Sequence, residues 1–188
     1  MFEMYSLISG SSGNATLVTN GHTHILVDCG ASGKRIAELI SMAGFDPSNI
    51  SAVLITHEHS DHTKGAGIVS RRFKLPIYAT AGTHNAMSIG TIDESKRVII
   101  SPLNNFEIGD IGVKPFNIPH DAAQPCGYSF FCDGIKLSIA TDIGHMTDEV
   151  MDSIKGSKSV ILESNHDIDM LRFGDYPYPL KQRILSDV

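Results

Sequence analysis

The sequence predicts a mixed α/β sandwich (α/β or α+β class) in which helices cover β-sheets. Short strand-like runs occur in clusters, and segments with helical periodicity separate these clusters along the chain. This order of elements is typical of a layered fold. No internal repeat, linker or compositional break divides the 188 residues, so we expect a single domain over 1–188 with a substantial core.

Strand and helix patterns alternate through the first hundred residues. An amphipathic helix is predicted at 33–42, a further helix at 64–72 and a strand at 75–79. The continuous apolar run 52–56 predicts a buried strand that ends next to His57. Three short strands with glycine-rich turns between them come first, over Glu3–Ile8, Ala15–Asn20 and Thr23–Val27.

The second half is richer in strands. Helices are expected at 147–154, at 167–173 and from Pro179 onward. The strands are predicted over Arg97–Ile100, Ile111–Ile118, Gly127–Phe131, Ile135–Ala140 and 159–163. Four side chains suited to metal binding or acid–base chemistry stand at the end of a strand pattern or just past it: His57, His120, Asp142 and Glu163. Because strand ends hold side chains rigidly and can face a common cleft, we expect these residues to be neighbours.

The composition is typical of a folded chain and disfavours some classes of binding partner. Hydrophobic residues make up 41% of the chain, and the net charge of −6 argues mildly against a nonspecific nucleic-acid binder. No apolar run approaches the roughly 20 residues that span a membrane. The first residues show no secretory signal. Three cysteines without metal-site spacing are expected to be reduced thiols in the cytoplasm.

The segment richest in potential metal ligands is Thr56–Gly65, with the sequence THEHSDHTKG. Imidazole and carboxylate groups suit zinc, manganese or iron. Adjacent Asp61 and His62 point differently from the alternating pair His57 and His59, so two ions sharing the loop fit better than one. The alternative is a chance patch of exposed histidines, which the position directly after a buried strand disfavours.

A two-metal site needs a bridging carboxylate and a further histidine, and Asp142 and His120 are the candidates. Two ions roughly 3.5–4 Å apart can share a hydroxide and clamp both sides of a hydrolytic displacement. The sequence therefore predicts two divalent ions, zinc or manganese with iron as an alternative, and a hydrolytic reaction.

The sequence resembles the metallo-β-lactamase-fold hydrolases over essentially its whole length. The segments that carry the resemblance are ILVDCG with Asp28, THEHSDH at 56–62, NIPHD with His120 and IATDIGH with Asp142. The resemblance implies an αββα sandwich with a dinuclear site at one edge. It also implies that His57, His59 and His120 bind the first ion, Asp61 and His62 bind the second, and Asp142 bridges them, while Asp28 orients the ligand loop from behind.

Further segments resemble the YycJ/WalJ-type exonuclease branch of this family. These segments are SLISGSSGNATLV (6–18), SIATDIGHMT (138–147) and LESNHD (162–167). The resemblance implies hydrolysis of phosphodiester bonds at DNA ends. Family members carry a last histidine ligand downstream of the bridging aspartate, and the chain ends at RILSDV before such a segment. We interpret the chain as truncated at its C-terminus, with substitution by His145 or His166 as the alternative.

Several other residues are candidates for supporting roles. Ser11, Ser12 and Asn14 lie in a small-residue loop that could receive a phosphate in a nest of backbone donors, or form an ordinary turn. His145 follows Asp142 by three residues and could contact the scissile phosphate or the leaving group, or face solvent at a helix start. With Asp61 and Asp142, it completes the predicted catalytic set.

The segment LESNHD supplies two more candidates. His166 could contact substrate or bind a metal, or hydrogen-bond at a helix N-terminus. Glu163 could support a ligand histidine. Cys29 is expected to be a buried small hydrophobe. Histidines without supporting neighbours, expected on the surface, are His22, His24 and His84.

Two rival functions use the same residues. A small-molecule hydrolase of the thioesterase, lactonase or lactamase type could use the same ligands, because the fold alone does not select the substrate. A non-catalytic metal-binding or regulatory module is the rival from another class. A redox diiron role is disfavoured, because that branch would place Glu where His59 stands.

Overall fold

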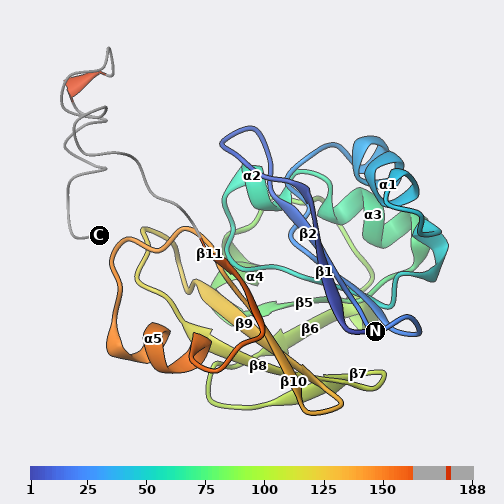
Figure 1. The fold of residues 1–188 in the computed structure, drawn as a ribbon. Coiled ribbons are helices and arrows are strands. Elements are labelled where there is room, and N and C mark those ends of the chain that lie inside the picture. The colour runs from blue at the N-terminus through green and yellow to red at the C-terminus, as the bar shows by residue number, and fades with distance from the viewer. Residues whose placement is uncertain (163–176, 179–188) are drawn as a thin grey trace.

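The computed structural model describes residues 1–162 and 177–178. Two β-sheets lie face to face, with helices on the outer face of each (Figure 1). The first sheet has six strands, hydrogen-bonded in chain order. They are β1 (Glu3–Ile8), β2 (Ala15–Thr19), β3 (His24–Val27), β4 (Ala52–Leu54), β5 (Ile77–Thr80) and β6 (Arg97–Ile100).

The second sheet has five strands in the order β11-β10-β9-β8-β7. Strands β10 and β11 pair in parallel, and the other neighbours pair antiparallel. Their bounds are β7 (Phe106–Ile108), β8 (Ile111–Asn117), β9 (Cys126–Cys132), β10 (Ile135–Ala140) and β11 (Ser159–Leu162).

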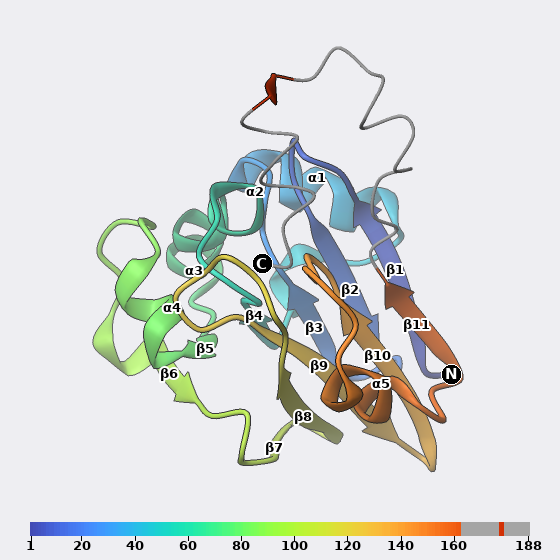
Figure 2. The same cartoon turned by 90° about the vertical axis from the view of Figure 1, so that its left-hand side faces the viewer.

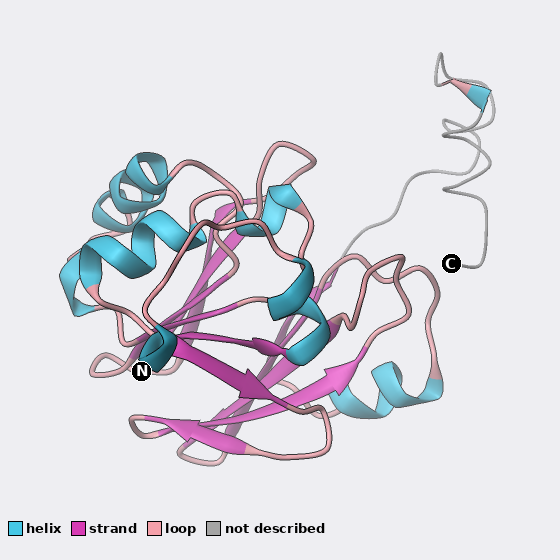
Figure 3. Cartoon of the chain, turned by 180° about the vertical axis from the view of Figure 1, so that it is seen from behind, coloured by secondary structure: helices cyan, strands magenta, loops and turns pink. Residues whose placement is uncertain are grey.

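Helices flank the two sheets on opposite sides of the molecule. Two of them cover the first sheet and one covers the second, so that the strands lie between helices (Figures 2 and 3). The helices are α1 (Gly33–Met42), α2 (Ser60–Thr63), α3 (Ala66–Phe73), α4 (Ala81–Ala86) and α5 (Asp148–Ile154), and two 3-10 turns cover Pro47–Asn49 and Glu94–Lys96. The predicted αββα sandwich is confirmed.

Three apolar layers hold the sandwich together, because alternate residues of a strand face opposite sides of a sheet. In β2, Val18 belongs to the core between the sheets, whereas Leu17 packs in the core under α1 and α3. A third cluster joins α5 to the second sheet. Burying one large apolar side chain in such a layer contributes about 1.5–3 kcal/mol to the free energy of unfolding. Strands with both faces covered have continuous apolar sequences, which is why the sequence of 52–56 predicts a buried strand.

One buried hydrogen bond ties the second sheet to the strand end before the ligand loop. Tyr128 in β9 is fully buried, and its hydroxyl donates to the carbonyl oxygen of Ile55 over 2.7 Å. A buried phenol needs such a partner. The contact fixes the end of the 52–56 run against the opposite sheet, directly before His57.

Most predicted elements are present, and the exceptions have local causes. The helix predicted over 64–72 is α3, which begins at Ala66, whereas the short helix α2 before it was not predicted. The two helices are separate because the N–H of Gly65 donates to the carbonyl of Cys29 at 2.8 Å instead of continuing α2. Strand β7 and helix α4 were not predicted, since three and six residues are too short to show periodicity. The helices expected at 167–173 and from Pro179 lie outside the described residues.

None of the helices within 1–162 and 177–178 has the length and apolar character that crossing a lipid bilayer requires.

Candidate metal centre

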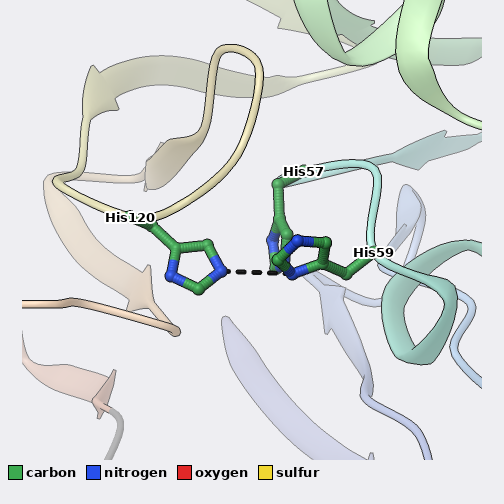
Figure 4. A group of neighbouring side chains, drawn as sticks. All are labelled: His57, His59 and His120. Carbon is green, nitrogen blue, oxygen red and sulfur yellow. Dashed lines mark hydrogen bonds between the residues drawn. The ribbon is translucent and has the colours of Figure 1, made fainter. Parts of the chain in front are cut away.

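Three histidine rings converge beside the end of β4. His57 follows this strand, His59 occupies the N-cap position of α2, and His120 extends from the loop after β8 (Figure 4). The Nδ1 atom of His59 lies 3.1 Å from Nε2 of His57 and 3.2 Å from Nε2 of His120. Tetrahedral ligands at zinc–nitrogen distances of 2.0–2.1 Å are separated by about 3.3 Å. The three nitrogens therefore fit one metal ion.

A second group of ligand atoms adjoins the first. Ligand atoms of His57, His62 and Asp142 all lie within 4.8 Å of one another. Asp142 Oδ2 is 2.9 Å from His62 Nε2, and Asp61 Oδ2 is 3.5 Å from the same nitrogen. The structure thus brings His62 and Asp142 together as expected, with His57 common to both groups and Asp61 at their margin.

Asp28 lies behind the ligands and is 3% exposed. Its Oδ2 is 2.8 Å from Nδ1 of His62, and its Oδ1 accepts the backbone N–H of Thr56 at 2.9 Å. Both Asp28 and Asp142 adopt positive φ angles, 61° and 54°. Aspartate tolerates this left-handed conformation better than most residues. Here it turns each carboxylate toward His62, one residue after β3 for Asp28 and two residues after β10 for Asp142.

Backbone contacts fix the position of the ligand loop. The carbonyl of Asp61 accepts the N–H of Asn14, and the carbonyl of His62 accepts the N–H of Cys29, both at 2.7 Å. A Cβ atom at Gly30 would lie 1.6 Å from the carbonyl oxygen of Asp61. Only glycine permits this approach, so the sequence DCG positions α2 as well as Asp28.

The loop that carries His120 is held on both sides. Glu58, between the first two histidines of the motif, accepts the N–H of Ala123 through Oε1 at 2.7 Å. The hydroxyl of Thr80 donates to the carbonyl of Gln124 at 2.8 Å. On the other side, the N–H of Gly144 donates to the carbonyl of Pro119, next to His120, at 2.7 Å.

Burial and neighbouring charges set the protonation of the histidines in opposite directions. Burial lowers the pKa of His57 to about 3, with the positive charge of His62 contributing. For His62, burial lowers the pKa, but Asp28, Asp142 and Asp61 outweigh it and raise the pKa to about 12. Because a ligand histidine must be neutral, His57 is ready to bind, whereas His62 must lose a proton as a cation takes its place.

The loop before β2 reaches the site through one side chain. The N–H of Gly10 donates to Oδ1 of Asn14, which turns the amide nitrogen of Asn14 toward the ligands. This nitrogen is 3.1 Å from Nε2 of His62 and 3.5 Å from Oδ2 of Asp61. Ser11 and Ser12 are exposed in the turn. The structure therefore brings Asn14, and not the two serines, into contact with the centre.

The remaining candidates differ in placement. His145 is exposed, and its neighbour Gly144 contacts the loop of His120. Glu163 and His166 lie outside the described residues. Sequence reasoning missed Thr56 and Glu58, although both stand beside the first histidine of the motif, where polar residues at a buried strand end are a usable signal.

The histidines and cysteine expected to play no part are mostly as predicted. His22 is exposed and His24 is half-buried, with Nδ1 2.7 Å from the hydroxyl of Thr19. The surface prediction for His84 is wrong: it is 6% exposed, and its Nε2 lies 3.1 Å from the carbonyl oxygen of Val98. Cys29 is fully buried and free, as expected.

Comparison with known proteins agrees with this geometry. The model of the family described as "Beta-lactamase superfamily domain" matches residues 23–176. The chain belongs to this superfamily. A solved structure, that of the metallo-beta-lactamase fold protein YhfI from Bacillus subtilis, superposes with a TM-score of 0.69 at 17% identity, covering 85% of this chain and 69% of that one. This likeness supports the fold.

Two curated relatives of this superfamily chain are much more similar in sequence. Exodeoxyribonuclease YycJ of Bacillus anthracis is 44% identical over 184 residues, which cover 97% of this chain and 70% of the relative. Exodeoxyribonuclease WalJ of Streptococcus pneumoniae serotype 2 is 37% identical over 191 residues, which cover 100% of this chain and 71% of the relative. The resemblance inferred from the motifs is confirmed. Members of the metallo-β-lactamase fold hold divalent metal ions, and the donor atoms described above suit them.

Proposed function

We propose that the chain is a divalent-metal-dependent phosphodiester hydrolase that removes nucleotides from DNA ends. The observation that carries the proposal is the pair of adjoining ligand groups that share His57. The names of the two relatives, both exodeoxyribonucleases at 44% and 37% identity, support DNA as the substrate. The proposed cofactor is two ions of zinc or manganese.

Each group of residues has a distinct task in this proposal. His57, His59 and His120 would hold one ion, His62 and Asp61 would hold the other, and Asp142 would contribute a carboxylate to both. Bound there, the ions would activate a water molecule near neutral pH and neutralise charge that develops on the phosphate. Asp28 keeps His62 oriented through the 2.8 Å contact with Nδ1.

Chain groups around the ligands would orient the phosphodiester. The amide nitrogen of Asn14 faces the centre and is a donor suited to a phosphate oxygen. We assign His145, which is exposed beside the loop of His120, the role of donor to the leaving oxygen. With a net charge of −6, the chain would bind DNA mainly through ions and a few cationic side chains, so binding should weaken with salt.

The test compares one DNA sequence as an end-labelled linear duplex and as a covalently closed circle, with manganese present. The proposal predicts release of nucleotides from the linear DNA and an intact circle. Asp61→Ala should abolish release, whereas Asp152→Ala, at an exposed aspartate of α5, should not. Equal cleavage of the circle would contradict action at ends. If the metal-loaded protein leaves the linear DNA intact, that result would contradict the nuclease assignment and favour a small-molecule substrate.

A further inference from the structure

Thr56 occupies the centre of the hydrogen-bond network behind both ligand groups. It is fully buried and precedes His57 at the end of the 52–56 run. Its hydroxyl oxygen lies 3.1 Å from Oδ1 and 2.9 Å from Oδ2 of Asp28, and 3.0 Å from Nδ1 of His57. Nδ1 of His62 is farther away, at 3.4 Å, and has a nearer acceptor in Oδ2 of Asp28 at 2.8 Å. The hydroxyl therefore stands between the buried carboxylate and a ligand ring.

Counting donors fixes the direction of these hydrogen bonds. A hydroxyl has one proton, and an ionised carboxylate only accepts. The proton of Thr56 must therefore go to Asp28, because two oxygens at 2.9 Å without a proton between them would repel. The hydroxyl oxygen is then available only as an acceptor toward His57, so Nδ1 of His57 must be the donor. In that tautomer, Nε2 of His57 carries the free lone pair.

That same Nε2 is the atom that faces the other ligands, 3.1 Å from Nδ1 of His59. We propose that Thr56 is a positioning residue whose hydroxyl extends the hold of Asp28 to His57 and sets the tautomer in which His57 can bind a metal ion. Asp28 thus supports both ligand groups, His62 by direct contact and His57 through Thr56. The inference rests on the metal-binding part of the proposed function and not on the DNA substrate.

The arrangement predicts unequal effects on the two groups. Replacing Thr56 by valine removes the hydroxyl at nearly constant volume. Asp28 then keeps two donors, the backbone N–H of residue 56 at 2.9 Å and Nδ1 of His62 at 2.8 Å. His57 loses its acceptor. Serine keeps the hydroxyl and loses only a methyl group, so Thr56→Ser is the matched control.

Nitrogen NMR of protein labelled with ¹⁵N at histidine tests the tautomer directly, metal-free and zinc-loaded. The wild type and Thr56→Ser should show His57 protonated at Nδ1, whereas Thr56→Val should lose this preference and leave the His62 signals in place. Zinc affinity of the position formed by His57, His59 and His120, measured by chelator competition, should fall about tenfold or more in Thr56→Val and stay unchanged in Thr56→Ser.

Two results would overturn the inference. One is a wild-type spectrum in which Nδ1 of His57 carries no proton, which needs no variant to fold. The other is a folded Thr56→Val protein with unchanged tautomer and unchanged zinc affinity. Neither measurement uses DNA, so inactivity on DNA would count against the proposed substrate alone.

Discussion

Asp28 and His62 face each other across 2.8 Å in an almost fully buried contact between Oδ2 and Nδ1. They come from segments 34 residues apart in the chain. The carboxylate turns the ring so that Nε2 points at Asp142, 2.9 Å away. Asp28, behind the site, therefore determines which nitrogen of His62 faces Asp142 and the other candidate ligands.

Asp28→Asn removes the charge of this carboxylate and keeps a side chain that tolerates its φ of 61°. We expect metal affinity to fall about 10- to 100-fold, because residues that orient ligands typically contribute this much. Chelator competition measures it. Asp133→Asn, at an exposed position with a φ of 49° in the turn before β10, is the matched control. Equal affinities of the two variants would contradict the role of Asp28.

Glu58→Ala should loosen the loop of His120, because it removes the acceptor for the N–H of Ala123 at 2.7 Å. We expect stability to fall by about 0.5–1.5 kcal/mol, with weaker binding at the three-histidine position. Denaturant unfolding and zinc titration measure the two effects. Glu58→Gln retains an acceptor oxygen and should behave nearly as the wild type. If Glu58→Ala changes neither the stability nor the zinc affinity, the hydrogen bond from Ala123 to Glu58 does not hold the loop of His120 in place.

Gly30→Ala should displace the ligand loop, since the new Cβ would lie 1.6 Å from the carbonyl of Asp61. Backbone has to move to relieve such a contact, so we expect a loss of more than about 2 kcal/mol in unfolding free energy. Loss of metal-dependent activity should accompany it. In Gly112→Ala, the nearest atoms are 3.7 Å from the Cβ, and little change is expected. A stable and active Gly30→Ala protein would refute the close packing of these segments.

Metal removal should lower the thermal midpoint. A ligand that binds only the folded state stabilises it by about 2.7 kcal/mol when its free concentration is one hundred times Kd. For a chain of this size, that corresponds to a shift of about 5–10 °C. Melting curves with zinc and with excess chelator measure it. His120→Ala, which removes one of three converging ligands, should show a smaller shift. Identical midpoints with and without metal would contradict a site formed by the folded chain.

Local patterns were sufficient to predict the layers and most of the residues that the structure brings together at the candidate metal centre. Continuous apolar runs mark strands covered on both faces, and HxHxDH, His120 and Asp142 stand where such strands end. Contacts across the fold were not accessible in the same way. That Glu58 reaches Ala123 is decided by how two distant loops pack. The buried position of His84 likewise follows from its packing against β6, where it meets the carbonyl of Val98.

A crystal structure of the chain soaked with manganese or zinc, with anomalous scattering to locate the ions, tests the central claim most directly. We expect one ion about 2.0–2.2 Å from Nε2 of His57, Nδ1 of His59 and Nε2 of His120. We expect a second ion beside Nε2 of His62 and the carboxylate of Asp142, roughly 3.5–4 Å from the first. Ions held elsewhere, or full loading with neither position occupied, would contradict it.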